Sequence, residues 1–170
     1  KKMMESLQNS AQLTHHVHAE ARAILQARKA YKNDSNPDLS AITLNDIISY
    51  CLIQALQKHP EINAHFLEKE IKVFRPVHLG FAVDTPRGLM VPVVKHANKL
   101  TIEALAAKMK ELAADCKAGK IDPDLLDSRK ASFTITNLGG YGVEMFTPVL
   151  NLPQVGILGI NTITQRVKEI

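Results

Sequence analysis

The chain has 170 residues, of which 45% are apolar and 22% are charged, and its formal net charge is +4. This length and composition are typical of one domain with a hydrophobic core, and the chain is too short for two such domains. No apolar run approaches the roughly 20 residues that span a bilayer, and residues 1–8 lack the apolar core of a signal peptide, so we expect a soluble, intracellular protein.

The charged and sulfur-containing residues narrow the function further. Lysine and arginine are spread along the chain and are not interleaved with aromatic residues, so a nucleic-acid module is a weak alternative. A few basic side chains at a rim would still favour a phosphate-bearing small molecule. Cys51 and Cys116 lie far apart in apolar helical patterns, and we expect both to be reduced thiols of the core rather than a redox pair or a disulfide.

The first part of the chain predicts two helices separated by a polar strand. Composition favours helices over residues 3–11 and 21–31, and alternation favours a strand over residues 13–19. Of the three histidines in this strand, His16 and His18 would share a face with each other but not with His15. No carboxylate or cysteine is placed to complete a zinc site, so we interpret them as a half-exposed polar strand face.

An amphipathic helix is predicted to begin at Thr43 and to end before Pro60. Thr43 and Asp46 have the spacing of a capping box. The apolar residues that follow recur at helical spacing and should pack on a sheet; they are Ile47, Ile48, Cys51, Leu52, Ala55 and Leu56. His59 lies two helical turns beyond Cys51, too far for a thiol and its base to meet directly.

The middle of the chain predicts hairpins and a second long helix. Strands are expected over residues 70–75, 77–84 and 89–94, with a turn at Thr85-Pro86-Arg87-Gly88 between the last two. Thr101 is the predicted N-cap of a helix that ends at Gly119. The remaining predicted elements are a short helix begun by Asp122 and Pro123 and a strand over residues 155–163.

Residues 132–142 have the strongest functional signal. Hydroxyl and apolar side chains alternate up to Asn137, and three glycines follow within four positions. One interpretation places Thr136 and Asn137 at a strand end that faces a reaction centre, with glycines that let the backbone approach a ligand. The alternative is an ordinary β-turn after a strand. A dinucleotide site is discounted, because the third glycine lacks the required spacing and no ribose-binding acid follows.

Three motifs together carry a family resemblance. They are Asp84-Thr85-Pro86-Arg87-Gly88-Leu89-Met90-Val91-Pro92-Val93, Phe133-Thr134-Ile135-Thr136-Asn137-Leu138-Gly139 and Pro153-Gln154-Val155-Gly156-Ile157-Leu158-Gly159. With further likeness over residues 4–63, the chain strongly resembles the catalytic domain of the dihydrolipoyl acyltransferase family, the acyltransferase subunit of 2-oxo acid dehydrogenase complexes. That family is similar in fold to chloramphenicol acetyltransferase.

The resemblance implies an α/β fold, an α+β sandwich whose mixed sheet is flanked by helices, in one catalytic domain over residues 1–170. It implies acyl transfer between dihydrolipoyl-lysine and coenzyme A, which is a substrate, without a metal. Homotrimers that assemble into a larger core are expected, with a lipoyl domain, a decarboxylase and a dihydrolipoamide dehydrogenase as partners, in the cytoplasm or in a mitochondrial matrix. The acyl group and the choice between a cubic and a dodecahedral core are left open.

The resemblance also assigns the site. In the family a histidine of a His-x-x-x-Asp-Gly motif removes the thiol proton, and a serine or threonine hydroxyl donates to the oxyanion of the tetrahedral intermediate. The hydroxyl position falls on Thr136, and Asn137 is expected to support its loop.

This sequence departs from the family pattern in two places. None of its seven histidines is followed by aspartate at the fourth position, so the catalytic histidine is missing, and we expect a C-terminally incomplete, inactive domain. Residues 129–131 replace the glycine-containing approach to the strand that relatives usually have. The alternative is a non-catalytic scaffold of the same fold that helps to build a complex core.

Overall fold

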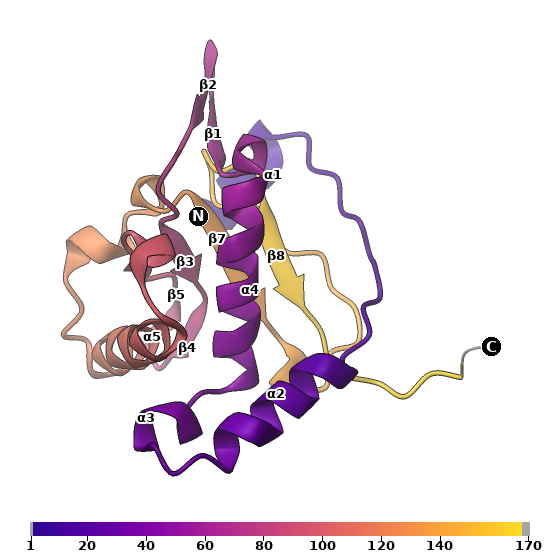
Figure 1. The fold of residues 1–170 in the computed structure, drawn as a ribbon. Coiled ribbons are helices and arrows are strands. Elements are labelled where there is room, and N and C mark those ends of the chain that lie inside the picture. Colours follow the sequence, from indigo (N-terminus) through magenta and orange to yellow (C-terminus); the bar gives the residue numbers. More distant parts are fainter. Residues whose placement is uncertain (1, 168–170) are drawn as a thin grey trace.

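A four-stranded sheet lies at the centre of the computed structural model, which describes residues 2–167 (Figure 1). Its α-helices are α1 (Lys2–Asn9), α2 (Arg22–Lys32), α3 (Pro37–Ser40), α4 (Leu44–Lys58) and α5 (Ile102–Ala118). Its strands are β1 (Ala64–Leu67), β2 (Glu70–Val73), β3 (Leu79–Phe81), β4 (Val83–Thr85), β5 (Gly88–Met90), β6 (Val93–Val94), β7 (Phe133–Asn137) and β8 (Ile157–Ile160). Short 3-10 helices are η1 (Pro60–Ile62), η2 (Ala97–Lys99), η3 (Pro123–Leu126), η4 (Ser128–Lys130) and η5 (Gly139–Tyr141).

The sheet is mixed, and β7 is an inner strand. The strand order is β6-β3-β7-β8; β7 runs parallel to both β3 and β8, whereas β6 is antiparallel to β3. Parallel neighbours cannot be joined by a tight turn. The chain therefore passes through α5 between β6 and β7, and residues 138–156 form the crossover from β7 to β8. The predicted mixed sheet flanked by helices is confirmed.

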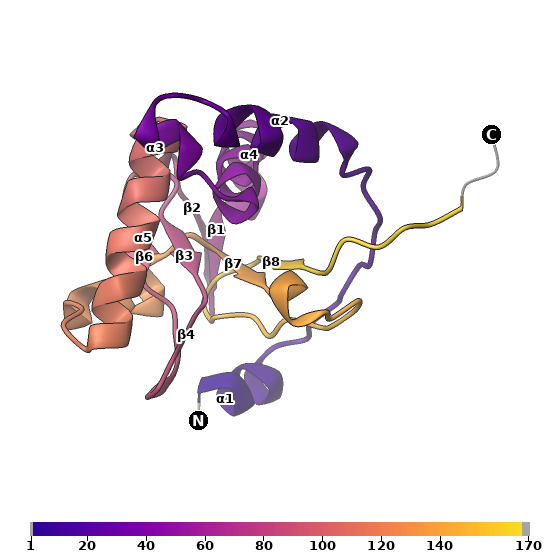
Figure 2. The same ribbon diagram turned by 90° about the horizontal axis from the view of Figure 1, so that it is seen from below.

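Different layers cover the two faces of the sheet. Figure 2 shows α4 and α2 on one side of β7 and β8, and α1 with the β7–β8 crossover on the other side. Side chains near the N-terminus bind the crossover at Leu150: Ser6 Oγ donates to its carbonyl oxygen at 2.6 Å, and its amide donates to Gln12 Oε1 at 3.2 Å. The crossover is thus held from outside by α1 and the residues after it.

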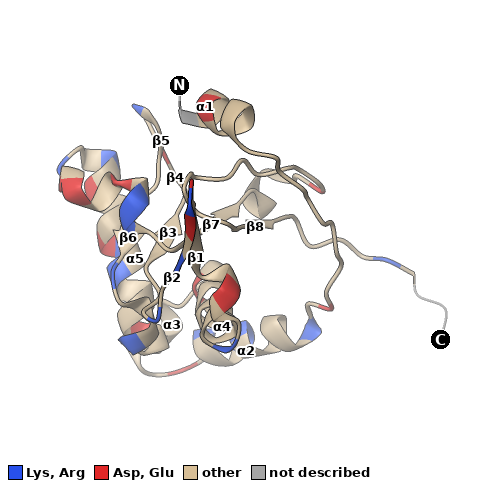
Figure 3. Cartoon of the chain, turned by 90° about the horizontal axis from the view of Figure 1, so that it is seen from above, with Lys and Arg blue, Asp and Glu red and all other residues tan. Residues whose placement is uncertain are grey.

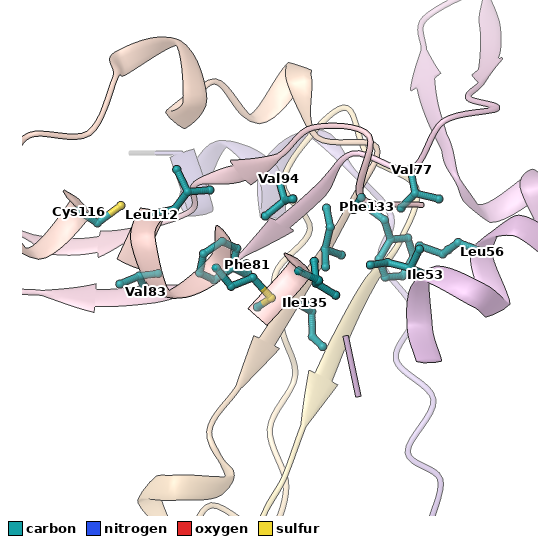
Figure 4. Packing of buried hydrophobic residues seen from close by; sticks show 14 residues of the cluster. Ile53, Leu56, Val77, Phe81, Val83, Val94, Leu112, Cys116, Phe133 and Ile135 are labelled. Carbon is teal, nitrogen blue, oxygen red and sulfur yellow. The ribbon is translucent and has the colours of Figure 1, made fainter. Parts of the chain in front are cut away.

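The hydrophobic core lies between the sheet and the helices α4 and α5 (Figure 4). Ile53 and Leu56 of α4 and Met109 of α5 pack there with apolar residues of β3 and β7. Cys116 is a buried core thiol as predicted, but the prediction for Cys51 was wrong, because Cys51 is exposed on α4. The inward face of α4 carries Asp46, Ile47, Ser49, Ile53 and Leu56 instead.

The predicted helix ends are confirmed by their hydrogen bonds. The Thr43 amide donates to Asp46 Oδ2 at 2.8 Å and the Asp46 amide to Thr43 Oγ1 at 3.3 Å, which is a reciprocal capping box. Thr101 Oγ1 accepts from the Ala104 amide. Gly119 ends α5 with a φ of 69°, a left-handed conformation that costs glycine little.

The two long strands predicted over residues 77–84 and 89–94 are each broken into two. The turn between β4 and β5 forms as predicted, with Gly88 at a φ of 101°. Farther from the turn, the Ala82 amide donates to the carbonyl of Ile135 in β7, while the Phe81 amide donates to that of Pro92. Proline has no amide hydrogen to return to the ladder, so the strand pair divides here.

One further strand prediction was wrong, and one strand was not predicted. Residues 13–19 form no strand but an extended coil on the outside, since they pair with no neighbouring strand in residues 2–167. The short strand β1 was missed, although it pairs with β2 in a hairpin that projects from the body (Figure 1).

Charged side chains lie mainly on the helices and hairpins, and β7 and β8 carry none (Figure 3). Between residues 131 and 163 the only charged side chain is that of Glu144. Among the described residues, no helix combines the length and apolar character that a transmembrane segment needs.

Candidate active site

The carboxyl end of β7 extends past one of its neighbours. β3 pairs with β7 only as far as Ile135, whereas β8 continues to pair with Thr136 and Asn137 through Gly159 and Ile160. In sheets with parallel strands, ligands bind beyond the carboxyl ends of the strands. The end of β7 is therefore the place where this fold presents polar side chains without completing the sheet around them.

Alternation along β7 divides the predicted site residues between two faces. Phe133 and Ile135 belong to the core, and Asn137 continues their face, whereas Thr134 and Thr136 point the other way. The expectation that Thr136 and Asn137 face one common centre was thus wrong within this chain. Asn137 lines a cavity on the helix side, and Thr136 lies on the crossover side.

On the crossover side, a buried polar network holds the strand just before Thr136. Thr134 Oγ1 donates to Gln154 Oε1 at 2.6 Å and accepts from Asn151 Nδ2 at 3.2 Å. Gln154 Nε2 donates in turn to the Ser128 carbonyl at 3.0 Å. Thr134 and Gln154 are each only 1% exposed, so these bonds are shielded from water and fix the strand firmly.

Thr136 itself is half-buried. Its partner on β8 is Gly159, whose missing side chain is replaced by the ring of Phe146; a Cβ there would lie 2.9 Å from Phe146 Cζ. Within residues 2–167 the Thr136 hydroxyl makes no hydrogen bond, unlike that of Thr134. Its proton is therefore not used by the fold and can be donated to a ligand.

On the helix side, Asn137 connects β7 to the loop and to α4. Its Oδ1 accepts from the Gly139 amide at 2.8 Å, and its Nδ2 donates to Asn45 Oδ1 at 3.1 Å. Asn45, Asn137 and Tyr141 line a cavity of about 300 Å³. A larger cavity of about 700 Å³ between α4 and α5 shares Asn45 and Tyr141 with it.

The three glycines after β7 differ in their surroundings. A Cβ on Gly139 would come within 2.8 Å of the Asn161 carbonyl oxygen, so its close approach is to the chain itself. Gly142 has a φ of 74°, which requires glycine-like freedom. Gly140 has open space around its Cβ position.

Among the described residues, no histidine is placed to act as a general base at this site. His15, His16 and His18 are exposed in the coil, and no group of three histidine, cysteine or acidic side chains in residues 2–167 could hold a metal ion. His65 is buried, and its Nε2 donates to the Ala131 carbonyl at 2.7 Å. Burial lowers the pKa of His65, and nearby Lys72 lowers it further, whereas the bond to Ala131 raises it.

The rings of His78 and His96 contact each other, with centroids 4.8 Å apart. Burial lowers the pKa of His78, and the neighbouring charges of His96 and Lys95 lower it further. The Nδ1 atom of His78 accepts a hydrogen bond from the His96 amide. This nitrogen is consequently engaged in the fold.

Two residues of this site were not predicted. Asn45 is a polar residue in the first turn of a helix, where such residues are common, and its contact with Asn137 spans 92 positions. Gln154 is part of the third family motif, but its position as the buried centre of the Thr134 network was not predicted. No local sequence signal distinguishes either residue from an ordinary surface amide.

Comparisons with known proteins show the family of this chain. The sequence model of the 2-oxoacid dehydrogenases acyltransferase (catalytic domain) family matches residues 1–169. The dihydrolipoyllysine-residue acetyltransferase component of the acetoin cleaving system of Bacillus subtilis is 39% identical over 160 residues, which are 94% of this chain and 40% of that protein. The chain thus spans about two fifths of the length of this relative.

Two solved structures have the same fold. One is the dihydrolipoamide acetyltransferase of Azotobacter vinelandii, in work on the role of a serine, a histidine and an asparagine in its catalytic mechanism; it has a TM-score of 0.89 and 29% identity over 97% of this chain and 68% of that one. The other is the cubic core of the pyruvate dehydrogenase multienzyme complex, with the same TM-score, identity and coverage. The chain belongs to the family of 2-oxoacid dehydrogenase acyltransferases and represents their catalytic domain.

Proposed function

We propose that this chain moves an acyl group between dihydrolipoyl-lysine and the thiol of coenzyme A, with Thr136 as the oxyanion donor. The observation that carries the proposal is the state of the Thr136 hydroxyl. It lies at the end of a firmly held inner strand, it is half-buried, and it makes no hydrogen bond to any other residue that the structure describes. A donor that is fixed before the reaction stabilises developing charge without reorganisation.

The reaction needs a nucleophile, a hydrogen-bond donor for the oxyanion and a base that takes up and returns a proton. A base takes the proton of the coenzyme A thiol, and the thiolate attacks the carbonyl carbon of the acyl-dihydrolipoyl thioester. The carbonyl oxygen becomes an oxyanion that accepts a hydrogen bond from Thr136. When the intermediate collapses, the bond to the dihydrolipoyl sulfur breaks, and that sulfur takes the proton back from the base. The acyl group leaves on coenzyme A.

We propose that the base comes from outside these 170 residues. No histidine here has the His-x-x-x-Asp-Gly pattern, and Glu144 is the only charged residue between residues 131 and 163. An unperturbed thiol with a pKa of about 8.5 is mostly protonated at neutral pH, so the reaction needs a base. Among the described residues, α1 is the one α-helix that Figure 2 shows on the crossover side of β7, and we propose that a second subunit approaches from this side.

Assembly into homotrimers, and of trimers into a larger core, is part of the same proposal. Large apolar side chains are exposed on two outlying elements, Met3, Met4 and Leu7 on α1 and Phe66, Ile71 and Val73 on the β1–β2 hairpin. Exposed apolar groups of this size are typical of protein interfaces. A lipoyl domain, a decarboxylase and a dihydrolipoamide dehydrogenase would be the further partners, in the cytoplasm or a mitochondrial matrix.

For the acyl group we propose acetyl. The Bacillus subtilis relative and the Azotobacter vinelandii structure are both named acetyltransferases. Turnover of acetyl, propionyl, isobutyryl and succinyl thioesters of coenzyme A by the full-length protein would compare the candidates directly. A preference for a branched or a dicarboxylic acyl group would contradict this part of the proposal while leaving the reaction class intact.

The test of the function uses the full-length protein with acetyl-coenzyme A and dihydrolipoamide. Thr136→Ala should lower turnover by about 100- to 1000-fold, or about 3 to 4 kcal/mol, with little effect on coenzyme A binding. Thr136→Ser, which keeps the hydroxyl, should nearly restore it. Thr101→Ala is the control, because it removes a threonine hydroxyl from the exposed N-cap of α5.

Three results are informative. Unchanged turnover in Thr136→Ala would contradict the role of Thr136. No turnover in the unaltered protein with any thioester, although it assembles, would support a non-catalytic scaffold instead. Loss of coenzyme A binding in Thr136→Ala would show that the hydroxyl acts on the ground state rather than on the oxyanion.

A further inference from the structure

The start of α4 provides a fixed point next to the end of β7. Asn45 is the second residue of α4, directly between the two partners of the capping box, Thr43 and Asp46. Asp46 is only 7% exposed, and its carboxylate accepts from both the amide and the hydroxyl of Thr43. The backbone at Asn45 is therefore held at both sides by local hydrogen bonds before any contact with β7 is considered.

The amide of Asn137 has one orientation that satisfies both of its neighbours. The Gly139 amide can only donate, so it requires the oxygen of Asn137, which accepts at 2.8 Å. The nitrogen of Asn137 then points to Asn45, whose own oxygen accepts at 3.1 Å. A third bond, from the Leu138 amide to the Ile160 carbonyl at 3.0 Å, joins this turn to β8.

The turn that follows Thr136 is held by hydrogen bonds, which also include those from the Tyr141 amide to the Leu138 carbonyl at 3.0 Å and from the Gly142 amide to the Gly139 carbonyl at 3.2 Å. Apolar packing is weak here: Leu138 is only half-buried, and Gly140 has no atom within 4 Å of its Cβ position. Glycine has the largest backbone freedom to lose on ordering. The side-chain bonds of Asn137 add a link from this turn to the start of α4.

We propose that Asn45 is a positioning residue for acyl transfer, which acts through Asn137 on the turn that follows Thr136. The inference rests on the proposed role of Thr136. A catalytic hydroxyl must keep its place within a fraction of an ångström, and small displacements by distant groups lower turnover strongly. The Asn45–Asn137 bond restrains Thr136 from the face of β7 that Thr136 itself does not occupy.

The position of the pair predicts which measurements change. Both side chains line the 300 Å³ cavity, where water can replace a lost hydrogen bond, so the bond contributes little to global stability. Its effect should be on the local order of the turn. Turnover is therefore expected to fall more than the free energy of unfolding.

The test compares Asn45→Ala with Asn45→Asp in the full-length protein. The alanine variant loses the acceptor, so kcat should fall about tenfold with the KM for coenzyme A unchanged. The aspartate variant keeps an acceptor oxygen for Asn137 and also suits the first turn of a helix, so it should restore most of kcat. Thr101→Ala is the matched control, because it weakens the start of another helix without touching this turn.

A second readout does not depend on activity. Amide hydrogen exchange at Gly139 should become faster in Asn45→Ala and remain slow in Asn45→Asp. Unchanged exchange and unchanged kcat in the alanine variant would overturn the proposal. Faster exchange with unchanged kcat would overturn the link to Thr136 alone. If the unaltered protein has no turnover, the proposed function fails, and exchange at Gly139 still tests the structural half of the inference.

Discussion

Thr134 and Thr136 are the same residue type on the same face of one strand, two positions apart. Thr134 lies opposite Gln154 and is buried in a network of three hydrogen bonds, whereas Thr136 lies beside Gly159 and has a hydroxyl without a partner in residues 2–167. Their neighbours, Gln154 on the crossover and Gly159 on β8, make the difference. One threonine fixes the strand, and the other is left available for chemistry.

At the residue scale we predict a pH dependence from His65. Its pKa is lowered in the folded protein, mainly by burial, so the neutral ring is favoured there. The unfolded chain, with an ordinary pKa near 6.5, binds the proton more readily. This contribution to stability is therefore complete above about pH 6.5 and is lost as the pH falls through the folded-state pKa.

Urea unfolding at pH 7.5 and pH 5 measures this effect. The unaltered protein should lose stability between the two values, and His65→Gln should lose less, because glutamine can still donate to the Ala131 carbonyl but takes up no proton. His15→Gln, in the exposed coil, controls for the removal of a histidine as such. An equal loss in the His65 variant and the unaltered protein would refute the assignment.

At the scale of elements, the C-terminus of α5 packs against the β4–β5 turn. Gly119 ends the helix in the left-handed region, and the guanidinium of Arg87 lies over it, in the space that a Cβ would occupy. A positive group at this end of a helix also complements the helix dipole. The glycine thus serves the helix end and the docking of the hairpin together.

We predict that Gly119→Ala destabilises the protein by about 1 to 2 kcal/mol from the left-handed backbone alone, with a further cost for displacing Arg87. Thermal or urea unfolding would measure it. Gly140→Ala is the matched control, because its Cβ meets no atom within 4 Å and its φ is not positive. Equal stability of the two variants would show that Arg87 and the cap contribute nothing measurable.

At the scale of the whole molecule, the site is half of what the proposed reaction needs. These residues provide the hydroxyl of Thr136, and Figure 2 shows α1 and the crossover on its face of the sheet. In the proposed assembly, the base comes from a neighbouring subunit. The exposed apolar residues of α1 and of the β1–β2 hairpin would then contact such a neighbour.

A mixed assembly tests the shared site. The 170-residue chain has Thr136 but no His-x-x-x-Asp-Gly motif and should be inactive alone. The second protein of the assembly is a family member that carries the motif but has its oxyanion hydroxyl replaced by alanine. It has the histidine and lacks the hydroxyl. Mixed trimers would pair the two at some interfaces and recover part of a contribution of about 100- to 1000-fold. If mass measurement shows mixed trimers that are as inactive as both parents, the shared site is wrong.

Local sequence signals determined the helix ends and the turns. The capping box of Thr43 and Asp46, the N-cap Thr101, the stop at Gly119 and the turn ending in Gly88 depend on residues within a few positions of one another, and each forms as predicted. The motifs at residues 84–93, 133–139 and 153–159 were likewise enough for the family and for the mixed fold, and they pointed to the end of β7.

Only the tertiary structure decided which residues meet there. Period-two alternation was visible in the sequence. The sequence did not show that β7 has a helix layer on one face and a crossover on the other, so that Asn137 and Thr136 have different surroundings. The same holds for the coil at residues 13–19 and the exposed Cys51, since a strand needs a partner and an apolar residue needs a surface to cover it. The bond from Asn137 to Asn45 spans 92 positions. Its geometry depends on how α4 packs on the sheet, and no residue near either asparagine encodes that.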